Sequence, residues 1–74
     1  MSEHDLVVLK VPVAEHGLEV GDVGTVVHVY EDGKAAEVEF ARADGATVAV
    51  VTLEASALRP FAAAEILHVR DLAS

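Results

Sequence analysis

Four histidines and two closely spaced carboxylates are the residues of this chain that could do chemistry. The histidines stand at least twelve residues apart, without the short spacing of a zinc motif, at His4, His16, His28 and His68. Glu37 and Glu39 alternate along the sequence, so a strand would place both carboxylates on one face, as a possible dyad. His28 with Glu37 opposite it could bind a metal. We favour the simpler interpretations, a solvated strand face and a cross-strand polar pair.

The sequence offers no convincing nucleophile for covalent catalysis. It contains no cysteine, two of its serines are terminal, and Ser56 has no histidine near it in the sequence. Gly17, Gly21 and Gly24 do not form a phosphate loop, because no Lys-Ser/Thr pair follows them. We assign these glycines to positive-φ turns and a bulge. We therefore expect no enzymatic activity, no catalytic residues, no metal site and no cofactor.

The size of the chain predicts a single domain, residues 1–74, with a marginal core. No disulfide can strengthen that core, so a protein partner or a homo-oligomer is the expected remedy. Thirteen acidic residues against five basic ones give a net charge of −8, which opposes binding to nucleic acid. The apolar run Leu6–Leu9 is too short for a signal peptide or a membrane span, so we expect a cytoplasmic protein that binds no membrane.

Runs of β-branched residues and of alternating apolar residues predict strands at Asp5–Val11, Val23–Tyr30, Ala35–Ala41, Thr47–Leu53 and Leu58–Phe61. These strands would position the histidine and glutamate side chains named above. Pro12–Asp22 is polar and predicts a long loop, and Glu54–Ala57 suits a 3₁₀ turn. Asp32-Gly33 and Asp44-Gly45 are each typical of a two-residue type I′ hairpin turn. We predict an extra strand at Glu65–Arg70, with a short helix as the alternative.

The two turns also predict the register of the central strands. The first would pair Val29 with Ala36, Val27 with Val38 and Thr25 with Phe40, and the second would pair Phe40 with Ala49, Val38 with Val51 and Ala36 with Leu53. Both turns select one common face as the core. Its predicted members are Val27, Val29, Val38, Phe40, Ala49, Val51 and Leu53.

The opposite face of these strands is mixed in character. One row holds Val26, Glu39 and Val50, and the next holds His28, Glu37 and Thr52, with Tyr30 and Val48 at the margins. This face carries too much charge to be buried completely, but it has enough apolar residues to contact another protein. The candidate protein-binding residues are Val26, His28, Tyr30, Val48 and Val50.

The order of these elements predicts an all-β fold, a small SH3-like barrel of about five strands with a C-terminal extra strand or short helix. Residues 5 to 72 resemble the bacterial family known as domain of unknown function 4926, through the segments DLVVLK, EHGLEVGDVGTVVHVYEDG, AEVEF, TLEASALRP and EILHVRDL. The resemblance implies an SH3-like fold and a gene paired with that of another uncharacterised small protein, as toxin and neutraliser. It implies no established activity.

Three functional hypotheses follow. The first is a protein-interaction module that binds a cognate protein or itself through the mixed face. The second is an acidic neutraliser, antitoxin-like or immunity-like, of a basic protein, and strong loss of binding at high salt would distinguish it from the first. The third is a small enzyme or metal-binding subunit, which only the dispersed histidines favour.

Overall fold

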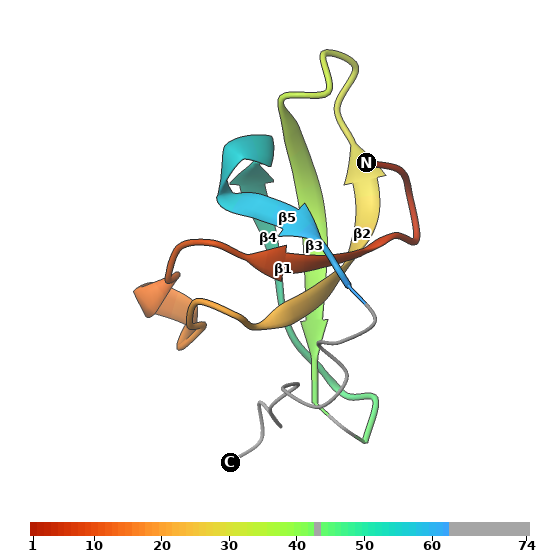
Figure 1. The fold of residues 1–74 in the computed structure, drawn as a ribbon. Helices are drawn as coiled ribbons and strands as arrows, with labels where there is room; N and C mark the ends of the chain where they lie inside the picture. Colours follow the sequence, from red (N-terminus) through yellow and green to blue (C-terminus); the bar gives the residue numbers. More distant parts are fainter. Residues whose placement is uncertain (43, 63–74) are drawn as a thin grey trace.

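The computed structural model describes residues 1–42 and 44–62 (Figure 1). This part of the chain forms a five-stranded antiparallel sheet in the order β4-β3-β2-β1-β5. Its elements are β1 (Leu6–Leu9), η1 (Ala14–His16), β2 (Val23–Val29), β3 (Ala35–Ala41), β4 (Thr47–Glu54), η2 (Ala55–Ala57) and β5 (Leu58–Pro60), where η marks a 3₁₀ turn. The predicted all-β architecture is confirmed. The element predicted at Glu65–Arg70 lies outside the described residues.

β2 belongs to both halves of the sheet. Its first residues, Val23–Thr25, pair with β1, and its later residues pair with β3. β1 and β5 therefore cross over β3 and β4 (Figure 1), so the sheet folds over its own core. This is the strand order of an SH3-like barrel. No pairing joins β4 to β5, so the barrel is open between these two strands.

The core lies between the two halves of the sheet. Five of the predicted core residues are buried, namely Val38, Phe40, Ala49, Val51 and Leu53, and Val29 is partly buried against them. The strand β1 adds Val7 and Leu9. Leu18 also belongs to the core, at 1% exposure, although the sequence predicted only a polar loop there. A bridge between Val13 and Leu18 closes that loop around η1 and turns Leu18 inward.

A β-bulge at Val27 makes part of the predicted register wrong. Val29 pairs with Ala36 as predicted, but Val26, not Val27, pairs with Val38. Likewise Thr25 pairs with Glu39 and not with Phe40. Two residues of β2 are accommodated where β3 has one, so the face that each side chain occupies changes at this point. Val26 is fully buried and Val27 is 38% exposed, the reverse of the prediction.

The first hairpin turn differs from the predicted type I′ geometry but keeps the predicted register next to it. At the first turn the Gly33 N–H donates to the Tyr30 carbonyl at 2.8 Å, and Gly33 has a positive φ whereas Asp32 does not. A type I′ turn needs positive φ at both central residues. Asp32 instead accepts a hydrogen bond from the Lys34 N–H at 2.8 Å. The resulting loop spans Glu31–Lys34 and leaves the pairing of Val29 with Ala36 unchanged.

The second turn closes at a different pair of residues, and a bulge compensates. The Arg42 N–H donates to the Ala46 carbonyl, and Ala41 pairs with Thr47, whereas the predicted turn would pair Ala41 with Val48. Val48 is then the extra residue of β4, so that Phe40 again pairs with Ala49 as predicted. The remaining predicted pairs of β3 and β4 are confirmed down to Ala36 with Leu53.

Three glycines were assigned to turns or a bulge, and the structure divides them. Gly17 and Gly21 have positive φ values of 68° and 94°. Gly24 lies inside β2 without a positive φ and outside the bulge at Val27. Phe40 and Val38 pack close to its backbone, where a Cβ would lie 2.9 Å and 2.5 Å from their nearest atoms. Gly24 therefore serves close packing, not a turn.

Candidate interaction surface

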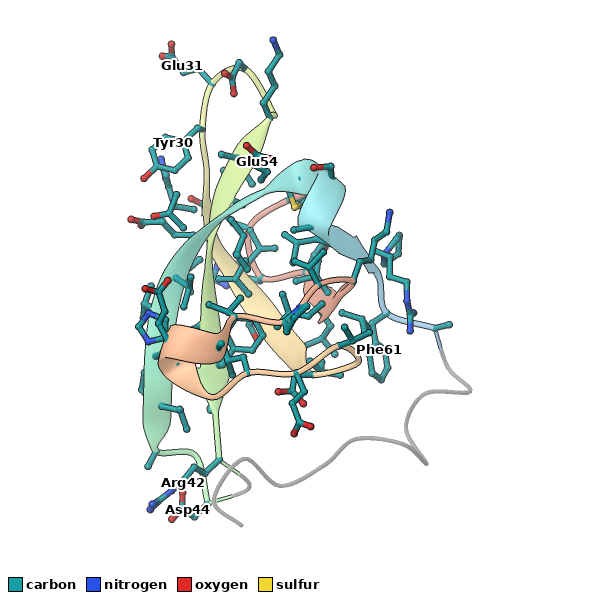
Figure 2. All side chains as sticks on the ribbon, turned by 90° about the vertical axis from the view of Figure 1, so that its left-hand side faces the viewer. Tyr30, Glu31, Arg42, Asp44, Glu54 and Phe61 are labelled. Atoms are coloured by element: carbon teal, nitrogen blue, oxygen red, sulfur yellow. The ribbon has the colours of Figure 1, made fainter. Side chains whose placement is uncertain are left out.

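The outer face, as we name it, is the side of β2, β3 and β4 that points away from the core. Strand alternation and the two bulges place on it Thr25, Val27, His28, Tyr30, Ala35, Glu37, Glu39, Ala41, Thr47, Val48, Val50, Thr52 and Glu54. Tyr30 directly follows β2 and projects from the ribbon on the side away from Phe61 (Figure 2). The predicted row His28, Glu37, Thr52 is confirmed, because Glu37 pairs with both of the others.

Four of the five predicted binding residues lie on the outer face, and one does not. His28, Tyr30, Val48 and Val50 are exposed there. The placement of Val26 on this face is wrong, because the bulge turns it into the core. Val27, which the sequence placed in the core, takes its position on the surface. Two adjacent valines carry no signal that says which one a bulge will expose.

Four apolar side chains on the outer face are open to solvent. Val50 is 52% exposed, Tyr30 and Val48 are each 39% exposed, and Val27 is 38% exposed. β4 supplies two of these residues, and β2 with the residue after it supplies the others. They flank the carboxylates of β3. Single exposed valines are ordinary, but several on one sheet face suit contact with another surface.

Polar contacts hold the carboxylates of β3 in place. The Tyr30 hydroxyl donates to Glu37 Oε1 at 3.3 Å, and the Thr47 hydroxyl donates to Glu39 Oε2 at 2.9 Å. The rings of Tyr30 and His28 meet edge to face, with centroids 4.8 Å apart. β2, β3 and β4 contain no Lys or Arg. The half-buried Glu37 and Glu39 are therefore held by neutral hydroxyl groups, without a cation from these strands.

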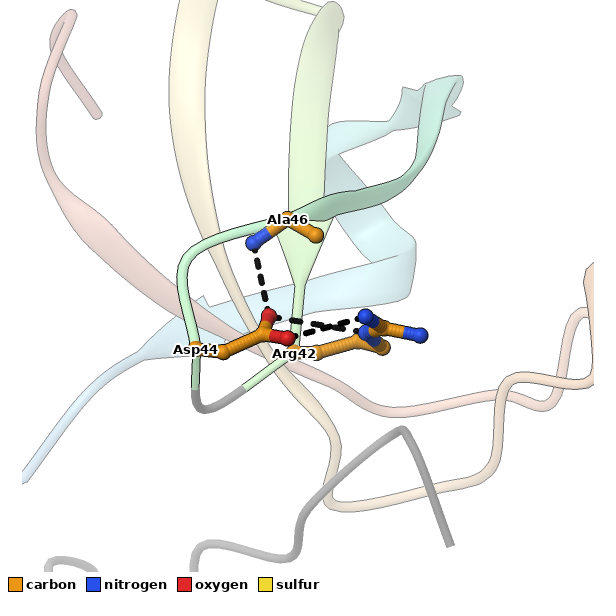
Figure 3. A network of polar contacts seen from close by, with 3 residues as sticks. All are labelled: Arg42, Asp44 and Ala46. Carbon is orange, nitrogen blue, oxygen red and sulfur yellow. Dashed lines mark hydrogen bonds and ion pairs between the residues drawn. The ribbon is translucent and has the colours of Figure 1, made fainter.

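A second polar cluster lies in the turn between β3 and β4. The Ala46 N–H and the Arg42 guanidinium both donate to Asp44, at 2.9 Å and 2.8 Å (Figure 3). These bonds stabilise the charged carboxylate, so the pKa of Asp44 is lowered, chiefly by the Ala46 N–H and then by Arg42. The ion pair is exposed at the opposite end of the hairpin from Tyr30 (Figure 2). We assign it a role in the turn.

Two further features of the described surface are its histidines and its depressions. Within residues 1–42 and 44–62, no three His, Asp or Glu side chains are placed to hold a metal ion. His28 Nδ1 lies 4.0 Å from Glu3 Oε1, and both side chains are at least half exposed. Two surface depressions share Gly33 and Ala55 in their linings, and neither contains a histidine or one of the exposed apolar residues of the outer face.

Comparison with known families decides the classification. The family model described as "Domain of unknown function (DUF4926)" matches residues 3–60, which is 58 of the 74 residues. The chain belongs to this family. The match covers every strand of the DUF4926 fold described above, and it confirms the resemblance seen in the sequence. No curated protein and no solved structure matches the chain. No helix in the described part of this DUF4926 chain is long and apolar enough to cross a membrane.

Proposed function

We propose that this chain is a protein-interaction module that binds a cognate protein, or a second copy of itself, through the outer face of β2, β3 and β4. One observation carries the proposal: four large apolar side chains, each more than a third exposed, surround a pair of anchored carboxylates. Protein interfaces combine apolar and aromatic contacts with polar groups in this way. The small core of a 74-residue chain also favours stabilisation by a partner.

The proposal assigns no enzymatic activity to the chain and no nucleic acid or membrane as its partner. The outer face offers apolar area and carboxylates, which suit a protein surface and repel phosphates. A cytoplasmic location is part of the proposal, because the chain has no cysteine for the disulfides that are common in small secreted domains.

Replacement of Val50 by lysine tests the role of the outer face. Val50 is its most exposed valine and pairs with Glu39, so Val50→Lys removes apolar contact area and neutralises a carboxylate that faces the partner. We expect it to abolish self-association in sedimentation velocity, or the capture of a specific protein from the native cell. The stability of the fold should change by less than about 1 kcal/mol, because the position points away from the core.

Val20→Lys is the matched control for this experiment. Val20 is 61% exposed in the loop before β2 and lies outside the outer face. The same exchange of valine for lysine there should leave association unchanged. If Val50→Lys binds whatever the unmodified chain binds, or if the two lysine variants lose it equally, the outer face is not the interface.

A second candidate function is the neutralisation of a basic protein. The absence of Lys and Arg from β2, β3 and β4, around Glu37 and Glu39, favours it. Charge-driven binding of this kind weakens steeply with salt, whereas apolar contact does not. An affinity that falls at least tenfold between about 50 and about 500 mM salt, where the screening length shortens from about 14 Å to about 4 Å, and that is unaffected by Val50→Lys would favour the neutraliser.

A further inference from the structure

Among residues 1–42 and 44–62, β4 is an edge strand whose outer backbone groups have no partner in the sheet. In the order β4-β3-β2-β1-β5 it pairs with β3 alone. The Ala55 N–H donates to the Lys34 carbonyl at 2.7 Å, and the register then directs the backbone groups of Leu53, Val51 and Ala49 toward β3 as well. Alternate residues of an antiparallel strand point their N–H and C=O groups in opposite directions. The backbone groups of Val50 and Thr52 therefore point away from β3.

The β4 edge lacks the features that normally protect an edge strand. Such edges are usually short, or carry lysine or proline that blocks pairing with another chain. The other edge, β5, is three residues long and ends at Pro60. β4 is eight residues long, contains neither lysine nor proline, and has its one bulge at Val48, near its start. From Ala49 to Leu53 it presents a regular, uncharged edge.

The carboxylates of β3 lie within reach of a strand added beside β4. Val50 pairs with Glu39, and Thr52 pairs with Glu37. Both β4 side chains are small and leave these carboxylates accessible from beyond the edge. Neighbouring strands are ~4.8 Å apart, so an added strand would lie about 10 Å from β3. The combined length of a glutamate side chain and an extended lysine or arginine side chain spans this distance.

On the core side of the same edge, an added strand would need apolar residues. Val51 and Leu53 point into the core from β4 and each retain 9% exposure. An apolar side chain at the alternate positions of an added strand would pack beside them and extend the core through the open seam of the barrel. The edge therefore suits a strand that alternates basic residues on one face with apolar residues on the other.

We propose that an extended segment of a partner protein, alternating Lys or Arg with apolar residues, pairs with the free edge of β4 and places its basic side chains over Glu37 and Glu39. This inference rests on the proposed interaction function and names the partner's chemistry. A second copy fits less well, because its β4 has no basic residue and its net charge is also −8. Addition of a strand to an exposed edge is a general mode of peptide recognition.

Selection from a displayed library of random dodecapeptides tests the proposal without knowledge of the partner. The whole chain is the bait, and selected peptides are synthesised for titration. We expect Lys or Arg at alternate positions, with β-branched or aromatic residues between them. In the complex, amide hydrogen exchange at Val50 and Thr52 should slow at least tenfold, because their N–H groups gain acceptors. Peptides without the alternation, or no selected peptide, would overturn the proposal.

Two variants, with Val50→Thr as a control, distinguish strand pairing at the β4 edge from contact with the outer face. Val50→Pro removes an N–H that bonds nothing within the sheet, so the fold should persist while binding falls at least tenfold. Val50→Thr keeps the N–H and should retain binding within about threefold, since it replaces one methyl group by a hydroxyl at an exposed position. Glu37→Gln with Glu39→Gln should weaken binding and flatten its salt dependence. The exchange measurement on the unmodified chain remains decisive if Val50→Pro fails to fold.

The outcomes distinguish this inference from the broader proposal. If the glutamine variant loses binding and Val50→Pro does not, the partner lies flat on the outer face, so strand addition is wrong and the interaction function stands. If neither these variants nor Val50→Lys affects binding, both fail. If the chain self-associates and Val50→Pro abolishes that association, the occupant is a second copy and the proposed basic segment is wrong.

Discussion

Gly24 is a residue whose missing side chain the core requires. A Cβ built at this position would lie 2.5 Å from Val38 Cγ1 and 2.9 Å from Phe40 Cε1. Both of these side chains are fully buried, so neither can move aside without displacing other core residues. The position lies in the part of β2 that pairs with β1, where Gly24 is opposite Val7.

We predict that Gly24→Ala lowers the free energy of unfolding by about 1–3 kcal/mol, the usual cost of overpacking a core. Chemical denaturation followed by circular dichroism measures this change. Gly33→Asn is the control, because Gly33 has positive φ and open space around it, and asparagine tolerates that conformation. It should cost less than about 0.5 kcal/mol. Equal losses in the two variants would show that the contact at Gly24 is not the cause.

The pKa of Asp44 provides a test of the second turn. The Ala46 N–H and then Arg42 lower the pKa of this carboxyl below its ordinary value of 3.8. A lowered folded-state pKa means that the stabilisation is present above the unfolded pKa and is lost as the pH falls through the folded value. The loss should therefore lie below pH 3.8. An NMR titration of the Asp44 carboxyl should have its midpoint there.

Arg42→Gln separates the two causes of this pKa shift. It should raise the midpoint of Asp44 toward 3.8 without reaching it, because the larger cause, the Ala46 N–H, remains. Lys34→Gln, in the other hairpin turn, should leave the midpoint unchanged. A midpoint that does not move in Arg42→Gln would mean that the ion pair drawn in Figure 3 does not persist in solution.

β2 pairs with two strands, β1 and β3, and contains a bulge. Its last residues, His28 and Val29, pair with β3 in the register predicted from the first turn, and its first residues, Val23–Thr25, pair with β1. The bulge at Val27 accommodates one extra residue between these parts, bends the strand and keeps Val26 and Val29 on the core side. Val27 and His28 then both lie outside.

The bulge predicts opposite results for two adjacent glutamate substitutions. Val26→Glu places a charge at a fully buried position and should unfold the domain, whereas Val27→Glu should cost less than about 1 kcal/mol. Thermal unfolding monitored by circular dichroism compares the two. A stable Val26→Glu protein together with an unfolded Val27→Glu protein would restore the bulge-free register that the sequence pattern predicted.

The whole molecule is strongly acidic, and the described cations are dispersed. Lys10 follows β1, Lys34 lies in the first hairpin turn, Arg42 pairs with Asp44, and Arg59 lies in β5. Phosphate binding requires several cations along one surface. A net charge of −8 therefore opposes binding to DNA and RNA everywhere on this surface.

We predict no complex with single- or double-stranded DNA or RNA in gel shifts at physiological salt. A basic nucleic-acid-binding domain of similar size provides the positive control for the assay. Micromolar binding that weakens steeply as salt is added would contradict the charge argument. Binding that is insensitive to salt would contradict the prediction of no complex as well, since it would show contacts other than those to phosphates.

Local patterns were sufficient for the elements and much of the surface. β-branched runs and two Asp-Gly turns predicted β2, β3 and β4 to within one residue at each end. The register of β3 with β4 agrees with the prediction because the bulge at Val48 compensates for the different closure of the second turn, and the row His28, Glu37, Thr52 agrees with it. Strand alternation, a short-range property of the backbone, places Glu37 on the outer face. The buried Val38 and Phe40 follow in the same way.

Three features depend on contacts between distant parts of the chain. Val26 is buried in place of Val27 because β2 pairs with both β1 and β3. The sequence alone would allow either valine at the core position. Leu18 enters the core only because the loop folds back through its bridge to Val13. In the described part of the chain, the backbone groups of Val50 and Thr52 are free because β4 ends the sheet, and which strand ends a sheet depends on pairings between segments far apart in the sequence.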